Sequence, residues 1–221
     1  MGQYLILAPV ILSFLILIIP GRITYWYVVA LNIFILLLTS IPSKRLIFTP
    51  GVTNFLLQGP FGHINLVIDG LSGFFILVTN FTFLTGILYS KGYLKIYGHQ
   101  KNQAQYALHY FSYTWLHLSM LGVLMLRDGL SFLIVWELMA VSSFLLILFE
   151  AEKRATLKTA VNYLIQMHIG FVLLVIAFLI CEKQTGEMSF DALRSCFEHS
   201  SNAGLFLLFV TSFLFRQAWE R

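Results

Sequence analysis

A single carboxylic acid inside a long apolar stretch is the residue best placed to do chemistry in this sequence. Glu137 lies near the middle of Leu130–Phe149 and is the only acidic residue there. An ionised carboxylate at the centre of a bilayer costs at least about 2.5 kcal/mol, so such residues usually belong to a proton path or an ion site, or pair with a buried base. A carboxyl group in this setting can also exchange protons near neutral pH. The stretch therefore predicts a proton carrier, with a neutral, hydrogen-bonded Glu137 as the structural alternative.

The helical neighbours of Glu137 offer it no partner. If Leu130–Phe149 is a helix, the residues near Glu137 on its surface are apolar: Leu133, Ile134, Ala140, Val141 and Phe144. We therefore expect Glu137 to be paired with a side chain from another helix.

A second group of polar residues follows along the next apolar stretch. Lys158, Asn162 and Gln166 are spaced by four residues, which places them on one face of a helix. Such a face is expensive in a membrane unless it lines a wet path. The alternatives are that Lys158 extends to the membrane surface and that the two amides bond to neighbouring helices.

Histidines extend this set. His168 lies two residues past Gln166 and so serves a different helix face. His109, Tyr113 and His117 share a face of the apolar stretch Ala107–Leu126. Because a histidine can pass a proton between its two nitrogens, these residues and His168 form a candidate relay. The alternative is that each histidine is a buried group satisfied by one neighbour.

The composition predicts the elements that must carry these residues. The 221-residue chain is 58% hydrophobic and 11% charged, with 21 Phe, whereas soluble domains carry about 25% charged residues. A membrane span needs about 20 mostly apolar residues, and regular structure facing lipid must be helical. We therefore predict an all-α, polytopic transmembrane bundle, with residues 1–221 as one domain. About seven spans are expected: Tyr4–Ile19, Tyr25–Ile41, Leu66–Tyr89, Ala107–Leu126, Leu130–Phe149, Thr159–Cys181 and a short Gly204–Phe215.

Local sequence features predict where some helices begin and end and what lies between them. The second span is expected to end at Pro42, and the region from Pro42 to Asn65 is expected to form a short hairpin outside the membrane. Asp69 and Asp128 are expected to cap the helices that follow them. Cys181 and Cys196 flank a polar loop; they are interpreted either as inert thiols or, if the loop is extracytoplasmic, as a disulfide.

Loop charges predict the orientation. Basic residues number five on the side of the N-terminus and nine on the other side, so the other side is expected to be cytoplasmic. The five are Lys44, Arg45, Arg127, Lys183 and Arg194; the nine are Arg22, Lys91, Lys95, Lys101, Lys153, Arg154, Lys158, Arg216 and Arg221. The predicted location is the cell inner (plasma) membrane, with the N-terminus outside. Basic residues are not clustered with aromatic ones on a soluble face, so no nucleic-acid partner is expected.

The sequence lacks the motifs of covalent and redox catalysis. It contains no glycine-rich phosphate loop, nucleophile elbow, c-type haem motif or iron–sulfur cysteine pattern. No cofactor, metal site or catalytic residue of its own is therefore predicted, and any oxidoreductase activity would belong to a complex that contains this chain.

Three motifs resemble a known family. The run Trp136-Glu137-Leu138-Met139 with its following Ser142-Ser143, the stretch Ile68-Asp69-Gly70-Leu71-Ser72, and Met167-His168-Ile169-Gly170 are similar to antiporter-like, proton-conducting membrane subunits. These subunits occur in respiratory complex I, Mrp-type sodium/proton antiporters and membrane-bound hydrogenases. Phe171 next to that glycine, where some complex I chains carry Asp, and Ser142-Ser143 favour the branch of hydrogenase component B. The resemblance implies a membrane-arm subunit that moves protons in response to redox chemistry elsewhere, with other membrane subunits, a peripheral redox arm and the lipid bilayer as partners.

The sequence departs from the family at its C-terminal end. The resemblance implies that Glu137 pairs with a lysine on a broken seventh helix, but Arg216 is the basic residue near that position. Arginine stays protonated and is a poor substitute for a lysine that titrates. The family's second, inverted repeat is also missing. We therefore expect an N-terminal fragment of such a subunit, from a truncated, frame-shifted or split gene.

Three functions remain open on the sequence. The first is a proton-translocating subunit of a redox-driven complex, of the hydrogenase or NADH:quinone oxidoreductase type, in which Glu137 carries the proton and Lys158, Asn162, Gln166, His168 and His117 line or couple the path. The second is an incomplete or vestigial structural subunit that conducts nothing. The third is an Mrp-type sodium/proton antiporter subunit.

Overall fold

The computed structural model describes residues 2–48, 51–59, 62–97, 101–150, 152, 154–199 and 203–214. The chain forms two compact units, Met1–Met125 and Leu126–Arg221, and each is described by itself. No observation tests the expectation of a single domain, which stays a prediction.

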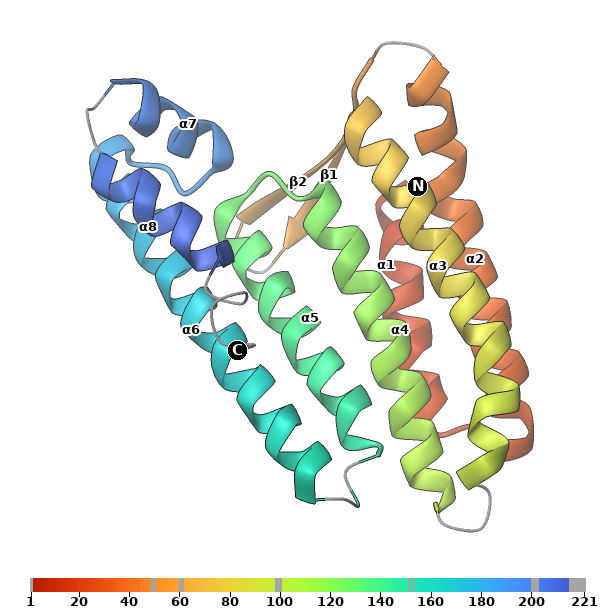
Figure 1. The fold of residues 1–221 in the computed structure, drawn as a ribbon. Coiled ribbons are helices and arrows are strands. Elements are labelled where there is room, and N and C mark those ends of the chain that lie inside the picture. The colour runs from red at the N-terminus through yellow and green to blue at the C-terminus, as the bar shows by residue number, and fades with distance from the viewer. Residues whose placement is uncertain are drawn as a thin grey trace. The chain divides into compact units, whose positions relative to one another are not determined.

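The first unit is a helical bundle with one β-hairpin (Figure 1). Its long helices α2, α3 and α4 pack along one another, with the shorter α1 against α2 and α4. The elements are α1 (Gly2–Phe14), the 3-10 turn η1 (Leu15–Leu17), α2 (Gly21–Phe48), β1 (Thr53–Gly59), β2 (Gly62–Ile68), α3 (Gly70–Leu94), the 3-10 turn η2 (Lys95–Tyr97) and α4 (Gln103–Met125).

Helix α2 runs through the proline that was expected to end it. The prediction of an end at Pro42 is wrong, because α2 continues to Phe48. Pro42 lacks the N–H that would bond to the carbonyl of Leu38. A helix in an apolar bundle tolerates this loss when neighbouring helices and Ser or Thr side chains support its backbone. Here Ser43 donates a hydrogen bond to the Thr39 carbonyl at 2.7 Å, and α2 packs against α3 over much of its length.

The expected hairpin is present, but later in the sequence. Strands β1 and β2 are antiparallel, with Thr53 opposite Ile68 and Leu56 opposite Asn65. Leu66–Ile68 therefore belongs to a strand, and the expectation that it opens the third span is wrong. The helix starts instead at Gly70, after the predicted cap: Asp69 accepts from the Ser72 N–H at 2.7 Å, and Ser72 Oγ accepts from the Asp69 N–H at 2.8 Å. This reciprocal pair is a capping box.

The second unit contains α5 (Gly129–Leu148), α6 (Arg154–Thr185), α7 (Phe190–His199) and α8 (Ala203–Leu214). Helices α5 and α6 are adjacent and antiparallel, and α8 lies along α6 (Figure 1). The predicted cap at Asp128 is confirmed, since its Oδ2 accepts from the Ser131 N–H at 2.7 Å. Helix α7 falls in the region that was expected to be a polar loop, so that expectation is wrong there.

Two glycines allow close packing in the second unit. A Cβ added at Gly129 would lie 2.8 Å from the Phe178 ring, which itself packs with Phe132 and Phe190. A Cβ at Gly170 would lie 2.8 Å from the Ser212 carbonyl oxygen, so α6 and α8 meet at Gly170.

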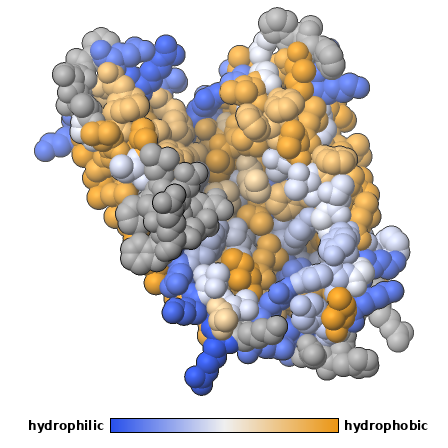
Figure 2. Space-filling view, in the orientation of Figure 1, coloured by the Kyte–Doolittle hydropathy of each residue, from blue (hydrophilic) through white to orange (hydrophobic). Residues whose placement is uncertain are grey.

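The surface is that of a membrane protein. Within the described residues, four helical segments are long and apolar enough to cross a bilayer: Ile23–Ile47, Gly70–Tyr97, Gly129–Leu148 and Arg154–Thr185. Leu7–Leu17 and Gly204–Phe213 are shorter apolar helices. Large apolar side chains such as Phe81, Ile165 and Val172 are more than half exposed. Figure 2 shows hydrophobic residues along the sides of the helices and hydrophilic residues at their ends. The predicted polytopic helical fold is confirmed, whereas the count of seven spans stays a prediction.

We predict that Gly170→Ala destabilises the protein by about 1–3 kcal/mol, because the new Cβ would press on the backbone oxygen of Ser212. Gly92→Ala in α3 is the matched control, since its Cβ would meet no atom within 4 Å and alanine favours a helix. The measurement is the midpoint temperature of aggregation of the detergent-purified chain. Equal midpoints for the two variants would show that α6 and α8 do not approach closely at Gly170.

Candidate functional site

The partner of Glu137 is a histidine from the next helix. Glu137 Oε1 on α5 lies 2.8 Å from His168 Nε2 on α6. The other ring nitrogen, Nδ1, lies 3.0 Å from the carbonyl oxygen of Leu164, one turn earlier on α6. The expectation that Glu137 pairs with a side chain from another helix is confirmed, and two predicted site residues are brought together.

These contacts define the protonation of the pair. A carbonyl oxygen only accepts, so His168 Nδ1 carries a proton and donates it to Leu164. The short contact between Nε2 and Oε1 then requires one more proton between them. That proton is either on a neutral carboxyl group facing a neutral imidazole or on an imidazolium facing a carboxylate. Both arrangements have no net charge, which lowers the penalty of placing them in an apolar helix pair.

The pair also has an open position for a further proton. Glu137 Oε2 is buried and has no hydrogen-bond partner in the described part of the chain. The two side chains are nevertheless partly accessible, at 25% for Glu137 and 48% for His168. His168 borders an apolar surface groove of about 500 Å3 on α6, formed with Leu164, Ile165, Ile169, Val172 and Leu173. The pair can thus be reached from one side of α6.

Gln166 serves another face, as its spacing predicts. It lines a small pocket of about 180 Å3 together with Trp136, Met139, Met167, Gly170, Ser212 and Phe213. The indole of Trp136 meets the ring of Phe213 edge-on, with the ring centroids 5.5 Å apart. Trp136, which precedes Glu137 in the sequence motif, therefore packs on α8.

Among the described residues, Lys158 and Asn162 make no hydrogen bond or ion pair with Glu137 or His168. Both side chains are exposed on α6, and neither makes a hydrogen bond within the described residues. Their predicted part in a proton path stays a prediction. Arg216, the basic residue near the family's lysine position, lies outside the described residues.

His117 lies in a separate polar network in the first unit. It is 1% exposed and is held between two asparagines. Its Nδ1 lies 2.9 Å from Asn32 Oδ1 on α2, and its Nε2 lies 2.9 Å from Asn80 Oδ1 on α3. The ring of Phe83 stacks on the imidazole at 4.4 Å. His117 therefore joins α2, α3 and α4.

The amide orientations in this network follow from their other bonds. Asn32 Nδ2 donates to the Val28 carbonyl, which leaves its Oδ1 for His117. Asn80 Nδ2 donates to Thr39 Oγ1 and Ser40 Oγ. With both carbonyl oxygens facing the ring, a ring N–H of His117 has an acceptor on either side.

Sequence reasoning missed Asn32 and Asn80. Each is an amide within an expected span, and a buried amide must find a partner because an unpaired one is costly. That signal points to a polar contact but not to the identity of the partner. Tyr113, expected to share a relay with His117, instead donates to the Phe83 carbonyl at 2.6 Å. The relay through His109, Tyr113, His117 and His168 stays a prediction.

Comparisons with known proteins agree with these motifs. Residues 127–219, which include Glu137 and His168, match the family described as NADH:quinone oxidoreductase/Mrp antiporter, transmembrane. Hydrogenase-4 component B of Escherichia coli (strain K12) is 27% identical over 135 residues, which are 61% of this chain and 19% of that protein. A protein of Staphylococcus aureus (strain USA300 / TCH1516) named as antiporter subunit mnhA2 is 27% identical over 152 residues, which are 69% of this chain and 18% of that protein.

Solved structures share the fold. A chain of the membrane-bound sulfane sulfur reductase, an archaeal respiratory membrane complex, superposes with a TM-score of 0.76 at 18% identity, over 97% of this chain and 43% of that chain. A chain of the Mrp complex from Dietzia sp. DQ12-45-1b gives a TM-score of 0.71 at 16% identity, over 97% of this chain and 23% of that chain. The chain spans less than a fifth of the length of the curated relatives that it matches.

The protein is thus a polytopic helical membrane protein with the fold of these solved structures. Its residues 127–219 are similar to the NADH:quinone oxidoreductase/Mrp antiporter family, in agreement with the resemblance of the sequence motifs. Both solved structures are of membrane complexes.

We predict that His117→Leu destabilises the first unit by about 1–3 kcal/mol for each asparagine carbonyl left unpaired. Tyr113→Phe, which removes one hydrogen bond to a helix carbonyl, should cost about 1 kcal/mol or less. Thermal unfolding of both purified variants in one detergent measures the difference. A triple variant with leucine at 32, 80 and 117 should recover part of the loss, and His117→Leu behaving like Tyr113→Phe would contradict the network.

Proposed function

We propose that this chain is a proton-translocating subunit of a redox-driven membrane complex of the hydrogenase or NADH:quinone oxidoreductase type. The observation that carries the proposal is the contact of 2.8 Å between Glu137 Oε1 and His168 Nε2, with His168 Nδ1 held by the Leu164 carbonyl. In this proposal the two side chains act as one proton carrier. The complex would include other membrane subunits and a peripheral redox arm, and would lie in the plasma membrane with the N-terminus of this chain outside.

The pair suits proton transfer because its resting state is uncharged. Loss of the shared proton would leave a net charge of −1, and a second proton on Oε2 would give +1. Either change is unfavourable in an apolar setting unless a charge elsewhere compensates it. A charge change created by redox chemistry in a neighbouring subunit could therefore drive the pair from one state to the next. Histidine would take the place that the family's lysine holds beside the carboxylate.

Gln166, Asn162 and Lys158 would extend the path along α6. Gln166 lines the pocket beside Trp136, and the exposed Asn162 and Lys158 follow toward the N-terminal end of α6. In this proposal Lys158 delivers protons from the cytoplasmic surface. His117, held by its asparagine contacts in the first unit, would couple to the path.

A sodium/proton antiporter subunit of the Mrp type is the second candidate. It is favoured by the antiporter relative, which is as similar in identity as the hydrogenase component and aligns over more of this chain. The two candidates differ in their response to sodium. Transport by a redox-driven proton pump should proceed in sodium-free medium and stop without electron donor, whereas an antiporter should require sodium and no donor. An incomplete structural subunit would show neither activity.

We predict that Glu137→Gln lowers proton transport by at least about 100-fold in membrane vesicles that contain the assembled complex. Glutamine can keep a hydrogen bond to His168 but cannot release a proton, so assembly should stay normal. Glu182→Gln, at an exposed position of α6, is the control and should transport at the normal rate. The readout is the quenching of a pH-sensitive dye, with subunit content measured by blotting. Normal transport by an assembled Glu137→Gln complex would remove Glu137 from the mechanism.

We predict that His168→Gln also lowers transport, by about 10-fold to 100-fold, and changes its dependence on pH. Because the two side chains share one proton, the double variant with Glu137→Gln should be no slower than Glu137→Gln alone. Rates measured across a range of pH in the same vesicles would show this. Independent, multiplicative losses in the double variant would mean that Glu137 and His168 act separately.

A further inference from the structure

The two cysteines of this protein meet at one end of the second unit. Cys181 lies in the last turns of α6 and Cys196 lies on α7, and their sulfur atoms are 2.9 Å apart. This separation is about 0.9 Å longer than a disulfide bond. Both side chains are buried, at 0% and 4% exposure. The thiols are thus placed against each other and covered by the fold.

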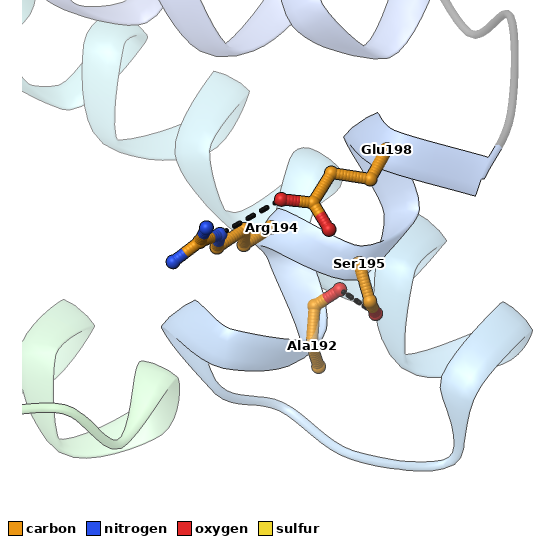
Figure 3. Close-up of polar contacts among 4 residues, drawn as sticks. All are labelled: Ala192, Arg194, Ser195 and Glu198. Carbon is orange, nitrogen blue, oxygen red and sulfur yellow. Dashed lines mark hydrogen bonds and ion pairs between the residues drawn. The ribbon is translucent and has the colours of Figure 1, made fainter.

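Helix α7 presents the cysteine from its inner face. Its buried residues are Ala192, Leu193 and Cys196, spaced so that they share one side of the helix. Arg194 and Glu198 form a charged, exposed side, where Arg194 Nε donates to Glu198 Oε1 at 2.9 Å (Figure 3). Within the helix, Ser195 donates to the Ala192 carbonyl. The bond to Glu198 and its charge raise the pKa of Arg194. An ion pair with both side chains more than half exposed is favourable in water and costly in lipid, so we infer that α7 lies at or beyond the membrane surface.

The connection between α6 and α7 is fixed at several points. The Gly129 N–H donates to the Met188 carbonyl at 2.9 Å, and the Phe190 N–H donates to the Arg127 carbonyl at 3.2 Å. The ring of Phe190 packs edge-on against Phe132 and Phe178. These contacts hold the start of α7 against α5 and α6. The approach of Cys196 to Cys181 is therefore set by the packing of the second unit and does not depend on a free loop.

We propose that Cys181 and Cys196 form an intramolecular disulfide that fastens α7 to α6. In this reaction the two thiols lose two protons and two electrons, and one S–S bond forms. The electrons reduce the disulfide of a thiol–disulfide oxidant to its dithiol. Because both sulfurs become covered, the bond forms while α7 docks during folding. Among the described residues no third His, Cys, Asp or Glu joins the two thiols as a metal site, so a disulfide suits the pair better than a metal ion.

The proposal commits this end of α6 to one side of the membrane. Structural disulfides form in oxidising compartments and are rare in the cytosol. The connection between α6 and α7 must then lie outside the cytoplasm, which is the side that the loop charges predict for it. The proposal does not depend on proton transport by this chain.

The test counts free thiols in the full chain, which contains two cysteines. Membranes from expressing cells are acid-quenched, dissolved in SDS so that burial cannot hide a thiol, and treated with a maleimide coupled to polyethylene glycol. We expect no adduct without reduction and two adducts after it. Cys181→Ser and Cys196→Ser are the matched controls, and each should show one adduct in both conditions.

Protease cleavage gives a second readout on the native chain. Lys183 and Arg194 lie between the two cysteines, so a trypsin cut at either site leaves two pieces that the disulfide holds together. These pieces should migrate as one band without reductant and separate with it. Two adducts on the unreduced chain, or a disulfide that joins two copies of the chain, would overturn the proposal.

Discussion

A polar side chain buried in an apolar helix of this protein is stabilised by a partner inside the protein, because lipid offers none. This constraint explains the contact between Glu137 and His168 and the network around His117. The first joins α5 to α6, and the second joins α2, α3 and α4. Few polar residues interrupt these helices, so each contact specifies which faces of two helices meet.

The same constraint favours an uncharged Glu137–His168 pair. An isolated charge in the membrane would be neutralised or excluded, whereas a carboxyl and an imidazole that share one proton stay uncharged together. The carbonyl of Leu164 occupies one nitrogen of His168 and so directs the other toward Glu137. A change of charge nearby could then shift the proton, which is what coupling to a distant reaction requires. Packing at Gly170, between α6 and α8, supports the helix that carries His168.

Much of the fold could be predicted from local patterns, and the errors have clear causes. The apolar stretches and the caps at Asp69 and Asp128 mark most helices correctly, because span length and capping depend on neighbouring residues. Pro42 was misread because the support of α2 by α3 is a tertiary effect. Helix α7 was missed because it is short and polar on one side, so its burial depends on contacts with α6.

The sequence by itself determined that this is a helical membrane protein with an acidic group inside a span. Its Trp-Glu-Leu-Met motif lies in the region that is similar to antiporter-like subunits. The partner of that acid was decided only by the tertiary structure. Glu137 and His168 are 31 positions apart, and helical periodicity describes the faces of each helix but not which faces meet. The contacts of His117 with its two asparagines and the contact of the two cysteines were likewise decided only by the tertiary structure. Contacts between distant residues follow from how helices pack, and that packing is shared among many side chains.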